Sequence, residues 1–245
     1  MSSTIGATAG SGADPAADRP PTLLAVAHGS RDPAAARMIE ALLRQVRALR
    51  PGLPARAAYL EIAPPAVGTA LAATSGPVVA VPMLLATGYH ATVDVPGAIA
   101  AARPDAAVGR VLGPHPLLAE ALADRLRQAG WRAGDSVVLA AAGSSDAAAA
   151  VATEAQARLL ATELGMPAVT AGYASTREPS VPAAVAAARA AGATRVVIAA
   201  YLLAPGLFQA GLAGAGADAV TEPLGDHPAV GRLVLLRYDE TRAIG

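Results

Sequence analysis

The first half of the chain contains two histidines and a glutamate whose side chains can bind a transition metal or transfer a proton: His28, Glu61 and His90. In the second half, the corresponding positions are occupied by Ala142, Ser175 and Phe208. Two imidazoles and a carboxylate form a donor set that divalent first-row transition metals accept. Because all three residues are missing together from the second half, we expect them to share one role, in metal binding or in proton transfer.

The correspondence between the two halves depends on four sequence blocks that recur in the same order. The matched pairs are residues 27–32 with 141–146, 59–67 with 173–181, 78–88 with 196–206, and 112–116 with 224–228. Their offsets are 114, 114, 118 and 112 residues. This pattern indicates an internal duplication.

The duplication predicts the domain organisation. A chain of 245 residues is long enough for two compact units of roughly 110 residues each. We predict a disordered segment at 1–21, a first lobe at 22–130 that carries the candidate metal site, and a degenerate second lobe at 136–240. The first segment is rich in Ser, Ala, Gly and Pro and has no apolar core of the kind that a secretory signal contains.

Short apolar runs alternate with helical patterns, which is typical of βαβ units and predicts an α/β fold with a parallel sheet in each lobe. In the first half, strands are predicted at 23–27, 55–60, 78–81 and 107–111, and helices from Asp32-Pro33 to Pro51-Gly52, from Pro64 to about Ala73, and at 116–128. A linker at 130–135 precedes the restart of the pattern at Ser136.

The predicted strands position the candidate site. His28 follows the first strand, Glu61 follows the second, and His90 lies in a long loop, residues 88–96, after the third. Ligands of such sheets bind at the carboxyl ends of the strands. We therefore expect the three side chains to project from one edge of one sheet.

Structural explanations also exist for individual residues. His28 is in a position where a histidine can cap a helix or lie in a loop, and Glu61 can be a solvated charge before two prolines. His115 and His227 differ from the candidate ligands because both halves keep them in a Leu-Gly-x-His-Pro motif before a helix. We expect a structural role for these two.

Composition restricts the compartment and the partners. The formal net charge is zero and 16% of residues are charged, so there is no basic field for a nucleic acid. The absence of cysteine excludes disulfides and thiolate metal sites, and it fits a reducing, cytoplasmic compartment. Residues 196–217 are uncharged over a length that could span a bilayer, but proline and glycines interrupt them. We expect a buried strand, a loop and a helix there, and no membrane association.

These motifs resemble the sirohydrochlorin chelatases, the CbiX and SirB type within the class II chelatases, over nearly all of residues 22–240. The motifs that carry the resemblance are His28-Gly29-Ser30-Arg31, Tyr59-Leu60-Glu61, residues 81–85 with Gly88-x-His90, Asp94-Val95-Pro96, and residues 112–115. The resemblance implies two similar α/β lobes facing each other across a cleft, as in the long form of the family. It also implies insertion of a divalent metal into sirohydrochlorin, with His28, Glu61 and His90 handling the metal and a histidine, His28 or His90, accepting a pyrrole proton.

The resemblance also bears on ligands and assembly. The tetrapyrrole carries many carboxylates, so Arg31 and the backbone near Gly29 and Ser30 are candidate substrate contacts, together with Gly88 and Asp94. Arg177 of the second lobe is a further candidate that could reach the ring from the opposite wall. The metal, Fe²⁺ or Co²⁺, is a substrate, and we expect no tightly bound cofactor. Because one chain supplies both lobes, we expect a monomer to suffice.

Iron insertion for sirohaem is favoured, since the chain lacks a His-rich tail, and cobalt insertion for cobalamin is the alternative. A non-catalytic carrier of metal or tetrapyrrole could use the same ligands. A phosphohydrolase that uses a phosphohistidine is a weaker rival, because that pattern has Arg before His-Gly, where this chain has Ala27.

Overall fold

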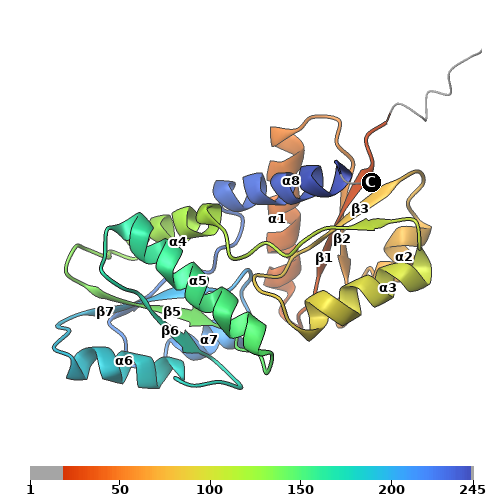
Figure 1. The fold of residues 1–245 in the computed structure, drawn as a ribbon. Helices are drawn as coiled ribbons and strands as arrows, with labels where there is room; N and C mark the ends of the chain where they lie inside the picture. The colour runs from red at the N-terminus through yellow and green to blue at the C-terminus, as the bar shows by residue number, and fades with distance from the viewer. Residues whose placement is uncertain (1–18, 244–245) are drawn as a thin grey trace, which may run out of the picture.

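The computed structural model describes residues 19–243, so most of the predicted disordered segment at 1–21 lies outside the described residues. The described chain forms two α/β lobes, each built on a four-stranded parallel sheet (Figure 1). This confirms the predicted fold class.

In the first repeat, the sheet has the strand order β2-β1-β3-β4. Its strands are β1 (Thr22–Ala27), β2 (Ala55–Tyr59), β3 (Val78–Pro82) and β4 (Ala107–Val108). The helices of this repeat are α1 (Pro33–Leu49), α2 (Val67–Ala72), α3 (Val95–Ala102) and α4 (Pro116–Gln128), with a π-helical turn, η1 (His90–Asp94), before α3.

The second repeat has the equivalent strand order, β6-β5-β7-β8. Its strands are β5 (Ser136–Ala141), β6 (Thr170–Tyr173), β7 (Val196–Tyr201) and β8 (Ala219–Val220). Its helices are α5 (Ala147–Leu164), α6 (Val181–Ala190), α7 (Leu207–Leu212) and α8 (Pro228–Arg242).

Three predicted elements of the first repeat differ from the structure. The helix predicted from Pro64 begins only at Val67. Residues 88–96 do not form one long loop, because His90 begins a helical turn that continues into α3. Pro96 is the second residue of α3, where a proline is tolerated. The strand predicted at 107–111 is only the two residues of β4, which pair with β3 at the edge of the sheet.

The last helix of each repeat packs on the lobe of the other repeat. Helix α8 lies against α1 and β3, and α4 lies against α5 and β7. In Figure 1 the blue α8 crosses the orange α1 beside the first sheet, while α4 lies with α5 over the second sheet. Each structural lobe is therefore completed by a helix from the other half of the sequence.

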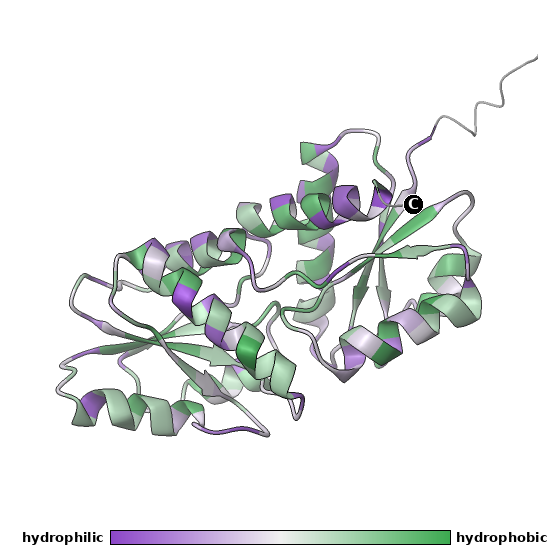
Figure 2. Ribbon diagram, viewed as in Figure 1, coloured by the Kyte–Doolittle hydropathy of each residue, from purple (hydrophilic) through white to green (hydrophobic). Residues whose placement is uncertain are grey.

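One continuous core results from this exchange. It includes buried Leu118 and Leu122 of α4 and Leu233 of α8 together with the inward faces of both sheets. Two smaller apolar clusters lie on the opposite faces, under α2 and α3 in one lobe and under α6 and α7 in the other. Figure 2 shows the apolar strands inside and the polar residues concentrated on the outer helices.

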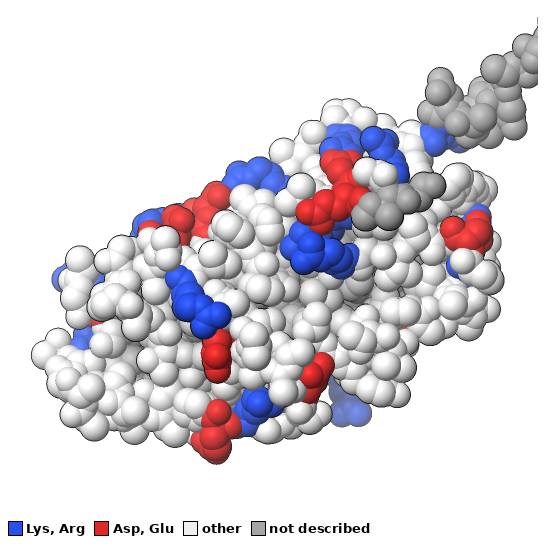
Figure 3. Space-filling view, in the orientation of Figure 1, with Lys and Arg blue, Asp and Glu red and all other residues white. Residues whose placement is uncertain are grey.

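The region predicted to be a strand, a loop and a helix at 196–217 is confirmed as β7, a connecting loop and α7. Within residues 19–243, no helix is long and apolar enough to cross a membrane. On the face drawn in Figure 3, arginines lie beside acidic residues in small groups and form no continuous basic surface.

Candidate active site between the lobes

The three candidate residues lie at the carboxyl ends of neighbouring strands. His28 directly follows β1, Glu61 lies just beyond β2, and His90 begins η1 after β3. Because β1 pairs with both β2 and β3 in parallel, these strand ends meet at one edge of the first sheet. The structure thus brings the three residues to one end of one lobe.

The distances define a histidine pair with a carboxylate beside it. The ring centroids of His28 and His90 are 4.5 Å apart. Nδ1 of His28 lies 3.4 Å from Oε1 of Glu61, which is an ion-pair distance and not a well-formed hydrogen bond. The same Nδ1 is buried and has no hydrogen-bond partner. This nitrogen therefore faces the interior beside Glu61, and a ligand would reach the exposed remainder of the ring first.

His90 has a partner on its own helical turn. Nδ1 of His90 lies 2.6 Å from Oδ2 of Asp94, four residues further along η1. An acidic partner on one ring nitrogen of a histidine selects the tautomer in which the other nitrogen is free to bind. The arrangement therefore directs Nε2 of His90 away from Asp94.

The carboxylates and imidazoles do not form a closed cage. Among residues 19–243, no group of three or more histidine, aspartate or glutamate side chains is close enough to enclose a metal ion. The site instead offers the His28–His90 pair, with Glu61 and Asp94 on its two sides. About half of the His90 side chain is exposed, and the His28 side chain is 42% exposed, so a ligand can approach both rings.

The loop that carries His28 has the same backbone in both repeats. Gly29 has φ +107° and Gly143 has φ +94°, and a Cβ on Gly29 would lie 1.9 Å from the carbonyl oxygen of Glu61. Only glycine fits such a position. The hydroxyl of Ser30 accepts a hydrogen bond from the N–H of Asp32 at 3.1 Å, and Asp32 caps α1. Gly29 and Ser30 thus shape this loop.

Two cavities lie between the lobes, at equivalent positions of the two repeats. The larger, of about 710 Å³, is enclosed by the loop after β1 and by the loop after β7. The smaller, of about 520 Å³, is enclosed by the loop after β5 and by the loop after β3. His28 lines both cavities, whereas His90 and Gly88 line only the smaller one.

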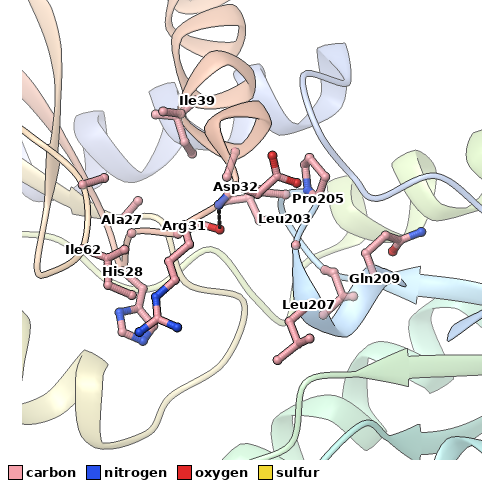
Figure 4. A pocket seen from close by; sticks show the side chains of 18 of the residues that line it. Ala27, His28, Arg31, Asp32, Ile39, Ile62, Leu203, Pro205, Leu207 and Gln209 are labelled. Carbon is pink, nitrogen blue, oxygen red and sulfur yellow. Dashed lines mark hydrogen bonds between the residues drawn. The ribbon is translucent and has the colours of Figure 1, made fainter. Parts of the chain in front are cut away.

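The walls of these cavities differ in chemistry. In the larger cavity, His28 and Arg31 lie on one side, and Leu207 and Gln209 lie on the other (Figure 4). Phe208, which occupies the position of His90 in the second repeat, lines both cavities and is 42% exposed. Leu207 is 87% exposed. The second lobe therefore faces the histidine pair with apolar side chains.

Two residues of this wall escaped the prediction from sequence. Phe208 was noted only as the replacement for His90, and Tyr201 was not singled out at all. A large apolar residue in a glycine-rich loop after a strand is the signal that marks Phe208. Tyr201 has no such signal, because a tyrosine at the end of a buried strand is ordinary core.

Two arginines were predicted to contact the substrate in the cleft. Arg31 is exposed and lines the larger cavity. Nη1 of Arg177 instead donates a hydrogen bond to the carbonyl oxygen of Ser144 at 3.3 Å, and Arg177 does not line either cavity. The structure thus places Arg31, and not Arg177, at the cavity wall.

His115 and His227 are helix caps, which agrees with the structural role predicted for them. Nδ1 of His115 accepts the N–H of Leu117 at the start of α4, and Nδ1 of His227 accepts the N–H of Ala229 at the start of α8. Burial is the main cause that lowers the pKa of both imidazoles. Both histidines lie outside the two cavities.

Comparison with known families matches each repeat separately. The CbiX family model matches residues 22–129 and again residues 136–241. The chain therefore belongs to the CbiX family, the sirohydrochlorin chelatase family, and it contains two copies of the CbiX domain. No curated relative matches the chain in sequence.

Solved structures share the fold. SirB from Bacillus subtilis with Fe³⁺ is 24% identical with a TM-score of 0.78, covering 91% of this chain and 95% of that one. SirB from Bacillus subtilis subspecies spizizenii in complex with cobalt is 22% identical with a TM-score of 0.72, covering 90% and 94%. A CbiX described as the terminal enzyme of sirohaem biosynthesis in denitrifying bacteria is 24% identical with a TM-score of 0.67, covering 89% and 98%.

Proposed function

We propose that this protein inserts a divalent metal ion into sirohydrochlorin in the cleft between its lobes. The observation that carries the proposal is the His28–His90 pair, 4.5 Å apart, which faces an apolar wall in a chain made of two CbiX repeats. The second repeat keeps the surrounding loop geometry without the imidazoles. This asymmetry supports a cleft in which the first repeat binds the metal and the second repeat contacts the ring.

The metal is a substrate in this reaction and must be bound weakly enough to leave. In the proposed site, the imidazole of His28 and the free Nε2 of His90 are the ligands, with Glu61 as a nearby carboxylate. So few ligands leave coordination positions open for the ring nitrogens, whereas a closed four-ligand cage would retain the ion.

Metal insertion also releases two pyrrole protons. Imidazoles accept protons near neutral pH, and His28 and His90 are the only histidines that line the cavities. Either imidazole can accept a pyrrole proton only through a ring nitrogen that is not bound to the metal.

Substrate contacts follow from charge and from shape. The apolar walls of the cavities suit the macrocycle, and Arg31 suits one of its carboxylates. Gly29, Ser30 and Gly88 can offer backbone contacts where the chain approaches the cavities. Asp94 is better placed to orient His90 than to contact the substrate, because a carboxylate repels a polyanionic ligand.

Iron is the metal that we favour, with sirohaem as the product, and cobalt insertion is the alternative. The solved relatives include SirB with Fe³⁺ and SirB in complex with cobalt. Nitrogen and oxygen sites bind Co²⁺ more tightly than Fe²⁺, and metal availability often decides which ion is used.

The test is an anaerobic absorbance assay with sirohydrochlorin and Fe²⁺ or Co²⁺ at substoichiometric protein. Wild type is compared with His28→Ala and His90→Ala, and with His115→Asn, which removes an imidazole outside the cavities and leaves a side chain that can cap α4. We expect multiple turnovers in wild type and His115→Asn and their loss in the two cavity variants. Stoichiometric binding without turnover would instead make the protein a carrier, and unchanged turnover in His28→Ala and His90→Ala would reject the assigned site.

A further inference from the structure

Tyr201 connects the second lobe to the loop that carries His90. Its hydroxyl, at the end of β7, donates a hydrogen bond to the carbonyl oxygen of Leu85 at 2.7 Å. Tyr201 is 3% exposed, and its ring lines the smaller cavity together with His90. Leu85 follows β3 and lies five residues before His90, so the bond crosses from one lobe to the other.

The second repeat lacks an equivalent link. The residue before Leu85 makes the same hydrogen bond in both repeats. The N–H of Leu112 donates to the carbonyl oxygen of Leu84 in the first repeat, and the N–H of Leu224 donates to the carbonyl oxygen of Leu202 in the second. At the next position, the Leu203 carbonyl accepts the N–H of Gly225 from its own repeat at 2.9 Å. The equivalent carbonyl, that of Leu85, accepts the Tyr201 hydroxyl from the opposite lobe.

The residues around the Tyr201–Leu85 hydrogen bond explain why only one of the two repeats accepts such a bond. Met83 occupies the position of Tyr201 in the first repeat, and a thioether cannot donate a hydrogen bond. A Cβ on Gly113 would lie 2.1 Å from the Tyr201 hydroxyl and 2.3 Å from the Leu85 carbonyl. Any larger side chain at residue 113 would therefore occupy the space that the bond needs. Burial raises the pKa of the Tyr201 hydroxyl, so the donor stays protonated.

We propose that Tyr201 is a positioning residue that sets the distance of His90 from His28 by tethering the Leu85 carbonyl to the second lobe. This inference rests on the proposed function, because the histidine pair that Tyr201 would position is the proposed metal site. The first lobe alone lacks this bond, so the His90 loop reaches its working position only when the second lobe is docked against it.

The test compares Tyr201→Phe with Tyr238→Phe. Tyr238 is also buried, and its hydroxyl donates to the carbonyl of Pro21 at 2.7 Å, far from the cavities. The two variants therefore remove the same type of bond and keep the ring. The readouts are thermal unfolding, hydrogen exchange of residues 85–91, Co²⁺ affinity, and kcat and KM for sirohydrochlorin.

We expect Tyr201→Phe to lower kcat by about tenfold while KM for the ring changes little, because displacing a reacting group is costly even when binding persists. Residues 85–91 should exchange faster and Co²⁺ should bind more weakly in this variant alone, with similar unfolding temperatures in both. The proposal would be overturned if hydrogen exchange and Co²⁺ affinity were the same in Tyr201→Phe as in Tyr238→Phe. A kcat of Tyr201→Phe equal to that of wild type would also overturn it. An inactive wild type would instead count against the proposed function, and exchange and Co²⁺ affinity would then decide the role of Tyr201.

Discussion

His28 and Ala142 occupy the same place in two loops whose backbones are nearly the same. Both loops have a glycine of positive φ after this position, at residues 29 and 143, and both have an aspartate that caps the next helix. The loop geometry therefore does not depend on the imidazole. A loop that is kept in both repeats without the imidazole indicates that the fold does not need His28, which agrees with the proposed role in metal binding.

Asp94 contacts Nδ1 of His90 and is expected to orient that imidazole. We expect Asp94→Asn to lower chelation by about tenfold, since partners that orient a metal-binding histidine typically contribute 10- to 100-fold. Asp105→Asn is the control, because Asp105 is exposed and lies outside the cavities. Steady-state kinetics with both metals measures the effect, and equal rates for the two variants would show that the contact of Asp94 with His90 has no catalytic value.

A second prediction concerns the apolar wall. Phe208→Ser should weaken binding of the metal-free ring by about tenfold, because burying a phenyl group against a ligand contributes roughly 1.5–3 kcal/mol. Co²⁺ affinity should stay unchanged, since the proposed metal ligands belong to the first repeat. Titration of the tetrapyrrole fluorescence measures ring binding. Leu236→Ser, at a partly exposed residue of α8 outside the cavities, is the control, and equal ring affinity in the two variants would exclude Phe208 from the binding surface.

At the scale of the element, α4 and α8 begin in the same way and share one dependence on pH. Their caps, His115 and His227, accept a backbone N–H through Nδ1, which only a neutral ring nitrogen can do. Burial lowers the pKa of both histidines, although Asp124 opposes this at His227. The two helices that connect the lobes thus start at groups that prefer to be neutral.

This predicts a loss of stability in mild acid. The unfolded chain has histidines with an ordinary pKa of about 6.5, so below this pH it binds more protons than the folded chain does. The contribution of the caps is therefore complete above about pH 6.5 and is lost as the pH falls toward the lower folded-state values. Thermal unfolding from pH 7.5 to pH 5 should show a smaller decline in the double variant His115→Asn/His227→Asn, and an identical decline would reject this account.

At the scale of the whole molecule, the exchange of α4 and α8 makes the two lobes one folding unit. Arg237 of α8 is buried and donates to the carbonyls of Val111 and Leu112, in the segment that leads to α4. Arg232 of α8 pairs with Glu120 of α4 at 2.6 Å. Neither repeat covers its own sheet completely, so a fragment with the bounds of one repeat lacks part of its core.

We therefore expect residues 1–130 alone to be unstable, because α8 no longer covers α1 and β3. Near-UV circular dichroism and binding of a hydrophobic dye should show a loosely packed fragment, and adding residues 131–245 should restore the native signal. A folded monomeric fragment 1–130 would contradict this expectation.

The intact chain should unfold in one cooperative transition and sediment as a monomer of 24.1 kDa.

Much of the fold could be predicted because its signals are local. The strands β1, β2 and β3 are marked by contiguous apolar runs, and the helices α1 and α4 by prolines at their starts and by the caps Asp32 and His115. The duplication itself revealed the candidate ligands, since two copies of one sequence show directly which polar residues one copy lacks. The α3 region was missed because Pro96 has the same local signature in a loop and in a first helical turn.

The sequence by itself determined the repeat, the order of the strands along the chain, and the edge of the sheet where His28, Glu61 and His90 lie. Only the tertiary structure decided which helix covers which sheet, and that Tyr201 holds the Leu85 carbonyl across the cleft. The physical reason is that strand and helix patterns are written in neighbouring residues, whereas α8 reaches α1, and Tyr201 reaches Leu85, from more than a hundred positions away. No local pattern specifies such contacts, because they exist only after both lobes have docked.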